Sequence, residues 1–332
     1  MEVVRALLAF WYRRDHTSEG RTWFERALRQ TEKEARTRAR AVALIMSGTL
    51  ATFQGDLITV RAQYEESIAI WRELGDKQGL AFALHGLGEV AVHQGDEQTA
   101  LSILEEARVL LQEVGDKPFY PVTLMRLGDV ALAQGNYPTA RHRYEDGLAI
   151  QHEIGDTWIV AQLLNNLGEV ARCEGDYGRA QPLYEESLTK FRALGTTGEI
   201  ARSLHNLAYV AHARGDHDQA ATLFGESLSL SQERGNRRGI AECLMGLAAV
   251  ALMQQQPAGV ERAARLLGTA EAQFAAIGAA MWPADRIEHA RTVAAVRAEL
   301  NDEAYAAATA VGRAMPLEQA VAEALESDAP TK

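Results

Sequence analysis

Histidine is the residue type in this chain that could most readily bind a metal ion or transfer a proton. The chain has nine, at His16, His85, His93, His142, His152, His205, His212, His217 and His289. His85 and His93 are eight residues apart, and His205 and His212 are seven apart, which on a helix places each pair on one face about 11 Å apart. That distance is too long for two ligands of one ion. We therefore predict no metal site.

The sequence also lacks the residue combinations that other kinds of catalysis require. No serine or cysteine can be matched with a histidine and a carboxylate as a nucleophilic set. The sequence contains no Gly-x-x-x-x-Gly-Lys-Ser/Thr loop that would hold a nucleotide phosphate. We predict no enzyme activity, no catalytic residue and no cofactor.

Carboxylates remain as candidate functional side chains, and three of them are evenly spaced. Glu89, Asp129 and Glu169 follow one another at intervals of forty residues. Equal spacing indicates equivalent positions in a repeated structure, so the role of these side chains depends on how one repeat folds.

The same interval of forty residues recurs in the glycines. One series comprises Gly55, Gly95, Gly135, Gly175 and Gly215, and a second comprises Gly75, Gly115, Gly155, Gly195 and Gly235. The residues that follow them are Asp56, Asp96, Asn136, Asp176, Asp216, Asp76, Asp116, Asp156, Thr196 and Asn236. Glycine can close a helix in the left-handed conformation, and Asp, Asn or Thr can cap the next one. The pattern predicts an all-α fold with two helices of about 16 to 17 residues per repeat.

Large and small residues recur at the same interval. We expect a large column to face a small column across each helix pair, which lets the helix axes approach to about 8 to 10 Å. The large column is Phe24, Tyr64, Leu104, Tyr144, Tyr184 and Phe224, and the small column is Gly48, Gly88, Gly128, Gly168, Ala208 and Ala248. Both columns are predicted to be core.

One stretch follows a known repeat consensus: Asn166-Leu167-Gly168-Glu169, Gly175-Asp176-Tyr177, Ala180, Tyr184 and Leu188. It resembles the tetratricopeptide repeat (TPR) family, in a long-helix form with forty residues per repeat in place of the usual 34. The resemblance implies a right-handed superhelical solenoid of about seven antiparallel helix hairpins. They are expected to start near residues 1, 41, 81, 121, 161, 201 and 241.

The repeat pattern ends before the C-terminus. The turn from Gln254 to Ala258 is longer by three residues, and the pattern is lost after Trp282-Pro283. Residues 284–300, 302–313 and 317–326 have helical patterns, and the end after Ser327 is expected to fray. We predict hairpins over residues 1–283, and capping helices with a frayed tail over residues 284–332.

The two ends of the chain carry further motifs. Near the start lie Phe10-Trp11-Tyr12-Arg13-Arg14 and Trp23-Phe24-Glu25-Arg26-Ala27-Leu28, and near the end lie Ala264-Arg265-Leu266-Leu267-Gly268-Thr269-Ala270-Glu271 and Pro316-Leu317-Glu318-Gln319-Ala320. These motifs resemble the C-terminal TPR sensor regions of bacterial signal-transduction ATPases and LuxR-type transcriptional regulators. The resemblance implies a non-enzymatic sensor that binds a peptide, protein or small inducer and controls a nucleotide-binding domain.

The sequence lacks a phosphate loop and a DNA-reading helix-turn-helix outside the repeats. Two alternatives therefore stay open: a regulatory part of a larger protein, or a stand-alone scaffold that assembles other proteins. Residues 1–40 carry ten Lys or Arg against six Asp or Glu. This basic first repeat either docks an upstream nucleotide-binding domain or is a solvated helix face that includes Arg13, Arg21 and Arg29.

Overall charge and cysteine content exclude several partners. With 45 acidic and 34 basic residues, the chain is not expected to bind nucleic acid directly. The apolar residues 3–12 are too short to span a membrane and have their arginines on the wrong side for a signal peptide. Cys173 and Cys243 lie two repeats apart, about 20 Å, which is too far for a disulfide. We expect a cytoplasmic protein without a membrane partner.

In TPR arrays the first helix of each hairpin lines the concave groove. The resemblance carries this ligand-contacting role to thirteen side chains: His85, Glu89, Arg126, Asp129, Asn165, Asn166, Glu169, Arg172, Arg202, His205, Asn206, Tyr209 and His212. The evenly spaced carboxylates disfavour a site for a peptide's C-terminal carboxylate and favour a segment with basic or amide groups.

The three carboxylates also have an interpretation without a ligand. Carboxylates about 10 Å apart repel each other by only about 0.4 kcal/mol in water. Pairing with Arg126, Arg172 and Arg202 would remove even this repulsion.

Overall fold

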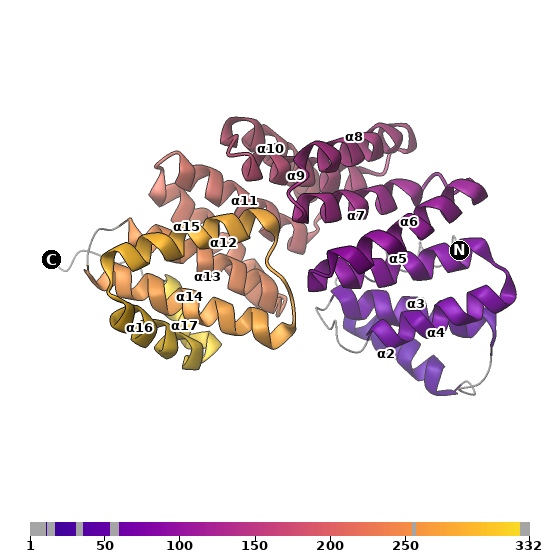
Figure 1. The fold of residues 1–332 in the computed structure, drawn as a ribbon, viewed down its shortest axis with the longest axis horizontal. Helices are drawn as coiled ribbons and strands as arrows, with labels where there is room; N and C mark the ends of the chain where they lie inside the picture. The colour runs from indigo at the N-terminus through magenta and orange to yellow at the C-terminus, as the bar shows by residue number, and fades with distance from the viewer. Residues whose placement is uncertain (1–10, 12–16, 31–35, 54–59, 254–256, 326–332) are drawn as a thin grey trace. The chain divides into compact units, whose positions relative to one another are not determined.

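The structure is a computed structural model, and it describes residue 11 and residues 17–30, 36–53, 60–253 and 257–325. Within these residues the regular elements are all α-helices, and no strand is present (Figure 1). The helices are α2 (Thr17–Gln30), α3 (Arg38–Phe53), α4 (Val60–Leu74), α5 (Lys77–Gln94), α6 (Glu97–Val114), α7 (Tyr120–Ala133), α8 (Tyr137–Ile154), α9 (Thr157–Cys173), α10 (Tyr177–Leu194), α11 (Thr197–Ala213), α12 (His217–Glu233), α13 (Arg237–Leu252), α14 (Pro257–Ile277), α15 (Pro283–Glu299), α16 (Asp302–Ala314) and α17 (Leu317–Leu325).

The chain divides into two compact units. Unit 1 contains Met1–Leu167 and Gly278–Ala280, and unit 2 contains Gly168–Ile277 and Met281–Lys332. In unit 1 the consecutive helices from α2 to α8 pack side by side, and in unit 2 those from α10 to α14 do the same, as in a TPR-like solenoid. The predicted all-α repeat fold is confirmed. The division into seven hairpins and a cap stays a prediction, because its first start and the tail after Ser327 lie outside the described residues.

The predicted helix boundaries agree with the structure at most of the glycine positions. The nine from Gly75 to Gly235 all have φ between 64° and 85°, in the left-handed region. Six residues accept a hydrogen bond from the backbone N–H three residues further on: Asp76, Asp96, Asn136, Asp176, Asp216 and Asn236. Asp156 similarly accepts from Trp158 N and Ile159 N. Gly55 and Asp56 lie outside the described part of the chain, as does the lengthened turn at residues 254–256.

Two of the predicted caps differ from this pattern. Asp116 accepts from Phe119 N at 3.2 Å, but α7 begins only at Tyr120. Pro118 explains the delay, because a proline disfavours the helical conformation in the residue before it. Thr196 makes no side-chain cap bond, and its hydroxyl donates to Phe191 O at 3.5 Å, at the end of the preceding helix.

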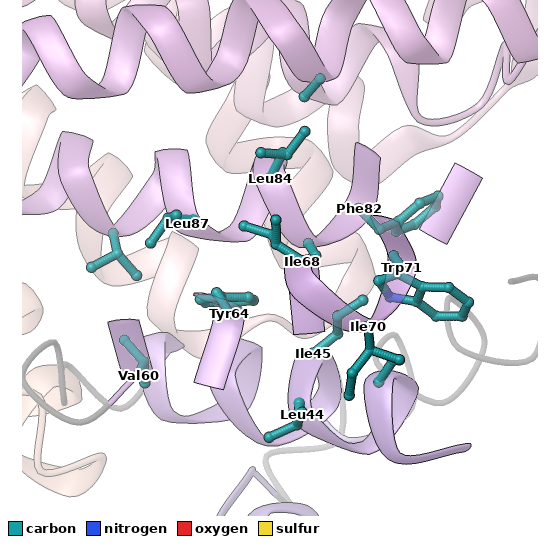
Figure 2. Packing of buried hydrophobic residues seen from close by; sticks show 14 of the residues in the cluster. Leu44, Ile45, Val60, Tyr64, Ile68, Ile70, Trp71, Phe82, Leu84 and Leu87 are labelled. Carbon is teal, nitrogen blue, oxygen red and sulfur yellow. The ribbon is translucent and has the colours of Figure 1, made fainter. Parts of the chain in front are cut away.

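The large and small columns form the core, as predicted, except that Phe24 of α2 is only partly buried. Five of the large residues, from Tyr64 to Phe224, have 0 % exposure. A Cβ on Gly168 would lie 2.6 Å from the ring of Tyr184, closer than carbon atoms can approach, so this position has room only for glycine. Figure 2 shows the first part of this core, where Tyr64, Ile68 and Trp71 of α4 lie between α3 and α5.

Helices α15, α16 and α17 occupy the three C-terminal segments with helical patterns. α16 packs closely on α14, since Gly268 and Gly312 let the two backbones meet, and the hydroxyl of Thr269 donates to Gly312 O at 2.7 Å. Of the helices described, none combines the length and the apolar character needed to cross a membrane.

Candidate functional site

The thirteen predicted contact residues are divided between the two units, and each unit contains a polar network built from some of them. Unit 1 holds His85 and Glu89 on α5, Arg126 and Asp129 on α7, and Asn165 and Asn166 on α9. Unit 2 holds Glu169 and Arg172 at the end of α9, with Arg202, His205, Asn206, Tyr209 and His212 on α11. Ten of the thirteen are buried, whereas Arg126, Arg202 and His212 are partly exposed.

Asp129 is the centre of the network in unit 1. Its Oδ1 accepts from Tyr144 OH at 2.8 Å and from Asn166 Nδ2 at 2.9 Å, while its Oδ2 accepts from Arg126 Nη1 at 2.8 Å. Arg126 also reaches back to Glu89, with Nη2 2.6 Å from Oε1. Burial would raise the pKa of Glu89, but the charge of Arg126 outweighs it and holds that pKa below its usual value.

His85 lies in the same unit but has an apolar setting. Its Nδ1 is 3.1 Å from Thr123 Oγ1, and its ring contacts Phe119 edge to face. Burial lowers the pKa of His85 to about 4, so the ring is neutral at pH 7.

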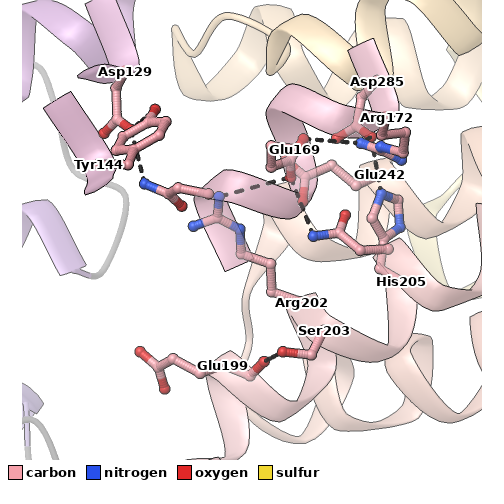
Figure 3. Close-up of polar contacts among 12 residues, drawn as sticks. Asp129, Tyr144, Glu169, Arg172, Glu199, Arg202, Ser203, His205, Glu242 and Asp285 are labelled. Atoms are coloured by element: carbon pink, nitrogen blue, oxygen red, sulfur yellow. Dashed lines mark hydrogen bonds and ion pairs between the residues drawn. The ribbon is translucent and has the colours of Figure 1, made fainter. Parts of the chain in front are cut away.

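Glu169 has the equivalent place in unit 2. Its Oε1 accepts from Asn206 Nδ2 at 3.1 Å and lies 3.7 Å from Arg202 Nη2, and its Oε2 accepts from Arg172 Nη2 at 3.3 Å. The three arginines that could neutralise the evenly spaced carboxylates therefore do pair with them. Figure 3 shows Arg172 and Arg202 beside Glu169.

The pairs between neighbouring repeats follow a rule that the sequence analysis missed. Arg126 bonds Glu89, Asn166 bonds Asp129 and Asn206 bonds Glu169, and the partners are 37 residues apart each time. We call these three pairs the inter-repeat ladder. Its signal was present in the sequence as a donor placed 37 residues after each acidic residue.

Asp285 of α15 joins the network in unit 2. Its Oδ1 lies 2.5 Å from Arg172 Nη2 and 3.1 Å from His205 Nε2 (Figure 3). Burial would lower the pKa of His205, but the charge and hydrogen bond of Asp285 raise it to about 10. Those same two cations hold the pKa of Asp285 well below its usual range, although burial opposes this. Asp285 is not among the predicted contact residues, because it lies beyond the repeat pattern.

Neighbouring contacts extend this arrangement along α15. The guanidinium groups of Arg202 and Arg238 lie 5.3 and 4.4 Å from the ring centre of Trp282, just before the helix. Tyr177 OH donates to Glu288 Oε1 at 2.7 Å. Tyr209 packs its ring against the guanidinium of Arg172 at 4.7 Å.

The two cysteines of the chain are present as thiols. Cys173 and Cys243 are both free. Burial raises the pKa of the Cys173 thiol to about 12, which keeps it protonated. Among the described residues, no group of three or more His, Cys, Asp or Glu side chains could hold a metal ion.

Comparison with protein families gives five overlapping matches to one family, described as tetratricopeptide repeat. They cover residues 40–113, 79–153, 119–193, 159–233 and 199–265. The chain belongs to the tetratricopeptide repeat family. TPR folds are typically non-catalytic scaffolds for protein interaction, with the ligand held by side chains of successive helices. The comparison with curated proteins finds no match.

Several solved TPR-like structures are similar in fold. A signal-transduction ATPase with a tetratricopeptide repeat sensor from Pyrococcus horikoshii has 15% identity and a TM-score of 0.58, over 92% of this chain and 50% of that one. Aspartyl phosphate phosphatase F from Bacillus subtilis has 12% identity and a TM-score of 0.61, over 86% and 73%. A Rap protein complexed with Competence and Sporulation Factor has 12% identity and a TM-score of 0.60, over 82% and 79%. At these identities the similarity shows the fold alone.

Proposed function

We propose that this TPR chain is a non-enzymatic sensor module that binds a peptide or protein segment, or a small inducer, and regulates a bacterial signal-transduction ATPase or transcriptional regulator. The observation that carries the proposal is the family membership together with the sensor-like motifs at both ends of the chain. The similar ATPase structure carries a TPR sensor, and two Rap structures hold a peptide or factor. A cytoplasmic location remains part of the proposal.

The proposed contact surface is the set of thirteen side chains on the first helices of the hairpins. The inter-repeat ladder occupies one oxygen each of Glu89, Asp129 and Glu169, so these carboxylates join neighbouring first helices. The partly exposed members, Arg126, Arg202 and His212, are the ones best placed to meet a ligand. This favours recognition of a segment with acceptor groups as well as one with basic or amide groups.

The test begins with peptides selected from a displayed library against the full chain. Hydrogen–deuterium exchange is then measured with and without a selected peptide. We expect slower exchange in the first helices α5, α7, α9 and α11, which carry the thirteen side chains, and unchanged exchange in the second helices α6, α8 and α12. Protection confined to the second helices would refute the proposed surface.

Substitutions give a second readout of the same surface. Arg202→Glu should weaken peptide affinity at least tenfold, because it reverses a charge on the proposed surface. Arg214→Glu, at the exposed end of the same helix, is the matched control and should leave the affinity unchanged. Equal affinities for both variants would remove Arg202 from the site.

The alternative is a stand-alone scaffold that assembles other proteins. The native reading frame around this sequence separates the two. A phosphate-loop ATPase encoded in the same polypeptide supports the sensor, and the basic first repeat would then be its docking surface. If no such domain shares the polypeptide, the scaffold is the better explanation.

A further inference from the structure

Helix α15 packs in unit 2 through polar side chains to an unusual degree. Its buried residues are Pro283, Ala284, Asp285, Glu288, Thr292 and Val296, of which three are polar and one of the others is an alanine. It contacts α13 and α14 and bonds to residues of α9, α10 and α11. The helix therefore covers side chains that belong to the proposed contact surface.

The centre of this contact is a buried carboxylate between two cations. Asp285 is 1 % exposed and lies between Arg172 and His205. Arg172 contributes only its Nη2, while its Nε and Nη1 have no hydrogen-bond partner in the part of the chain that the structure describes. An arginine fork can hold a carboxylate through two parallel bonds, so Asp285 uses only part of what Arg172 offers.

Two further contacts show which kind of helical segment can bind where α15 lies. Trp282, three residues before Asp285, lies against Arg202 and Arg238. Glu288, three residues after Asp285, accepts from Tyr177 OH. An aromatic side chain and two carboxylates at intervals of three residues lie along one side of a helix. We call Arg172, Tyr177, Arg202, His205 and Arg238 the α15-binding face.

α15 is attached through charged side chains, whereas the next helix, α16, is attached by close packing. α16 meets α14 through close backbone contact at Gly268 and Gly312, where a Cβ would clash with the backbone of the other helix. A buried ion pair adds little net stability compared with apolar packing, but it strongly selects the charge of its partner. α15 is therefore held mainly by ion pairs and hydrogen bonds of its side chains, and less by buried apolar surface.

We propose that the α15-binding face recognises an acidic helical segment of a partner protein, with an aromatic residue before its first carboxylate, and that α15 occupies this face until the partner segment displaces it. This rests on the proposed function and names the chemistry of the partner. Arg172 and Arg202 share Glu169, and Arg238 pairs with Glu242. With protonated His205 the face therefore carries four cations against two carboxylates, and this net positive charge complements an acidic segment.

The test uses a fluorescent synthetic peptide with the sequence of residues 281–300, added to the full chain. Binding is measured by fluorescence anisotropy to the wild-type chain, to Asp285→Lys and to Asp302→Lys. Asp285→Lys should release α15 and bind the peptide at least tenfold more tightly than the wild-type chain. Asp302→Lys is the matched control, since that side chain is 95% exposed on α16, and it should match the wild type. A peptide with Asp285→Asn should bind at least tenfold more weakly.

Hydrogen–deuterium exchange of the wild-type chain keeps the proposal testable if Asp285→Lys does not fold. The amides of α15 should exchange faster than those of α13 and α16. Exchange of all three at one common rate would overturn the proposal, because α15 would then be an integral part of the fold.

A concentration-dependent dimer that exchanges α15 between two copies would overturn the proposal in favour of a second copy as the occupant. Peptides that protect α5 and α7 while α15 stays protected would leave the proposed function intact and reject this inference alone.

Discussion

Asp129 joins three helices through one carboxylate. It accepts from Arg126 on its own helix, from Tyr144 on the second helix of the same hairpin, and from Asn166 on the next repeat. A buried charge needs such partners, because removing it from water costs several kcal/mol. The carboxylate is therefore a structural centre for unit 1 in addition to any contact with a ligand.

Substituting Asp129 by alanine should lower the free energy of unfolding by about 3 to 5 kcal/mol, since it leaves buried donors without their acceptor. Urea unfolding followed by circular dichroism measures this. Asp146→Ala is the control, because Asp146 is 44% exposed and its Oδ2 lies 3.4 Å from Nε2 of the exposed His142. That variant should stay within about 0.5 kcal/mol of the wild type. Equal losses for both would show that Asp129 has no special structural role.

His205 should make the stability of unit 2 depend on pH in a defined direction. Its pKa is about 10 in the folded chain and about 6.5 in an unfolded one, so the folded state binds more protons between these values. The groups that face it are Asp285 of α15, Arg172 of α9, and Glu242 and Cys243 of α13. The stabilisation is complete below pH 6.5 and is lost as the pH rises towards 10.

The measurement compares the wild type with His205→Gln at several pH values. Their difference in unfolding free energy should shrink from pH 6.5 to pH 10, by at most about 1.4 kcal/mol per pH unit. His85→Gln gives the opposite case, because burial lowers the pKa of His85 to about 4. There the wild type should lose stability relative to the variant as the pH falls from 6.5 to 4. A difference that does not vary with pH would contradict either assignment.

The sequence selected the thirteen side chains as ligand contacts, and the structure shows that several of them bond to one another. The resemblance to TPR arrays selected residues such as Asn166 and Glu169, because equivalent positions repeat. It did not reveal the bond from Asn206 to Glu169, since that pairing needs the offset between neighbouring repeats. Asp285 could not be predicted at all, because it lies 113 residues from Arg172 in a segment without periodicity. Whether the thirteen residues contact a ligand stays a prediction.

Helix pairs in this chain depend on small residues opposite large ones. A Cβ at Gly168 would meet the ring of Tyr184, and one at Gly88 would meet Leu104, both at 2.6 Å. Neighbouring helices would have to move apart to make room. The pairing therefore sets the distance between the helices as well as the volume of the core.

Gly168→Ala should destabilise the chain by about 1 to 3 kcal/mol, because the added methyl group overpacks a closed contact. Gly225→Ala is the matched control in the middle of α12, where the nearest atom to the new Cβ, in Leu325, is 3.7 Å away. It should stabilise the chain by about 0.5 to 1 kcal/mol, as alanine favours a helix more than glycine does. Thermal unfolding of both variants is the measurement, and a shift of the same sign in both would refute this packing account.

Helix boundaries were predictable because glycine and a capping residue act locally. Asp96 and Asn136 start their helices directly after the glycine, through bonds to Thr99 N and Thr139 N. The prediction was wrong in detail at Asp116, where Pro118 delays the helix, and at Thr196, where the hydroxyl bonds backwards. In both cases an interaction present in only one repeat overrides the capping that the recurring glycine pattern predicts.

At the scale of the whole chain, the division into two units predicts independent losses of structure. Contacts in repeat proteins are mostly between neighbours, so a local defect weakens mainly its surroundings. Trp71 in unit 1 and Leu267 in unit 2 are both fully buried. Trp71→Ala should cost about 3 to 5 kcal/mol and Leu267→Ala about 2 to 5 kcal/mol.

Hydrogen–deuterium exchange resolves where each loss occurs. Trp71→Ala should speed exchange in α3, α4 and α5 and leave α12, α13 and α14 at the wild-type rate. Leu267→Ala should give the reverse. Faster exchange throughout the chain in either variant would show that the two units unfold as one.

The inter-repeat ladder makes the order of the repeats chemically specific. Deleting residues 93–132 would keep the glycine interval but place Asn166 opposite Glu89, so a buried carboxylate would lose its guanidinium and gain only a neutral amide. Deleting residues 133–172 would place Asn206 opposite Asp129, which restores the same kind of pair. Recombination between repeats is therefore compatible with the ladder at some junctions and incompatible at others, although the uniform glycine spacing alone would permit it everywhere.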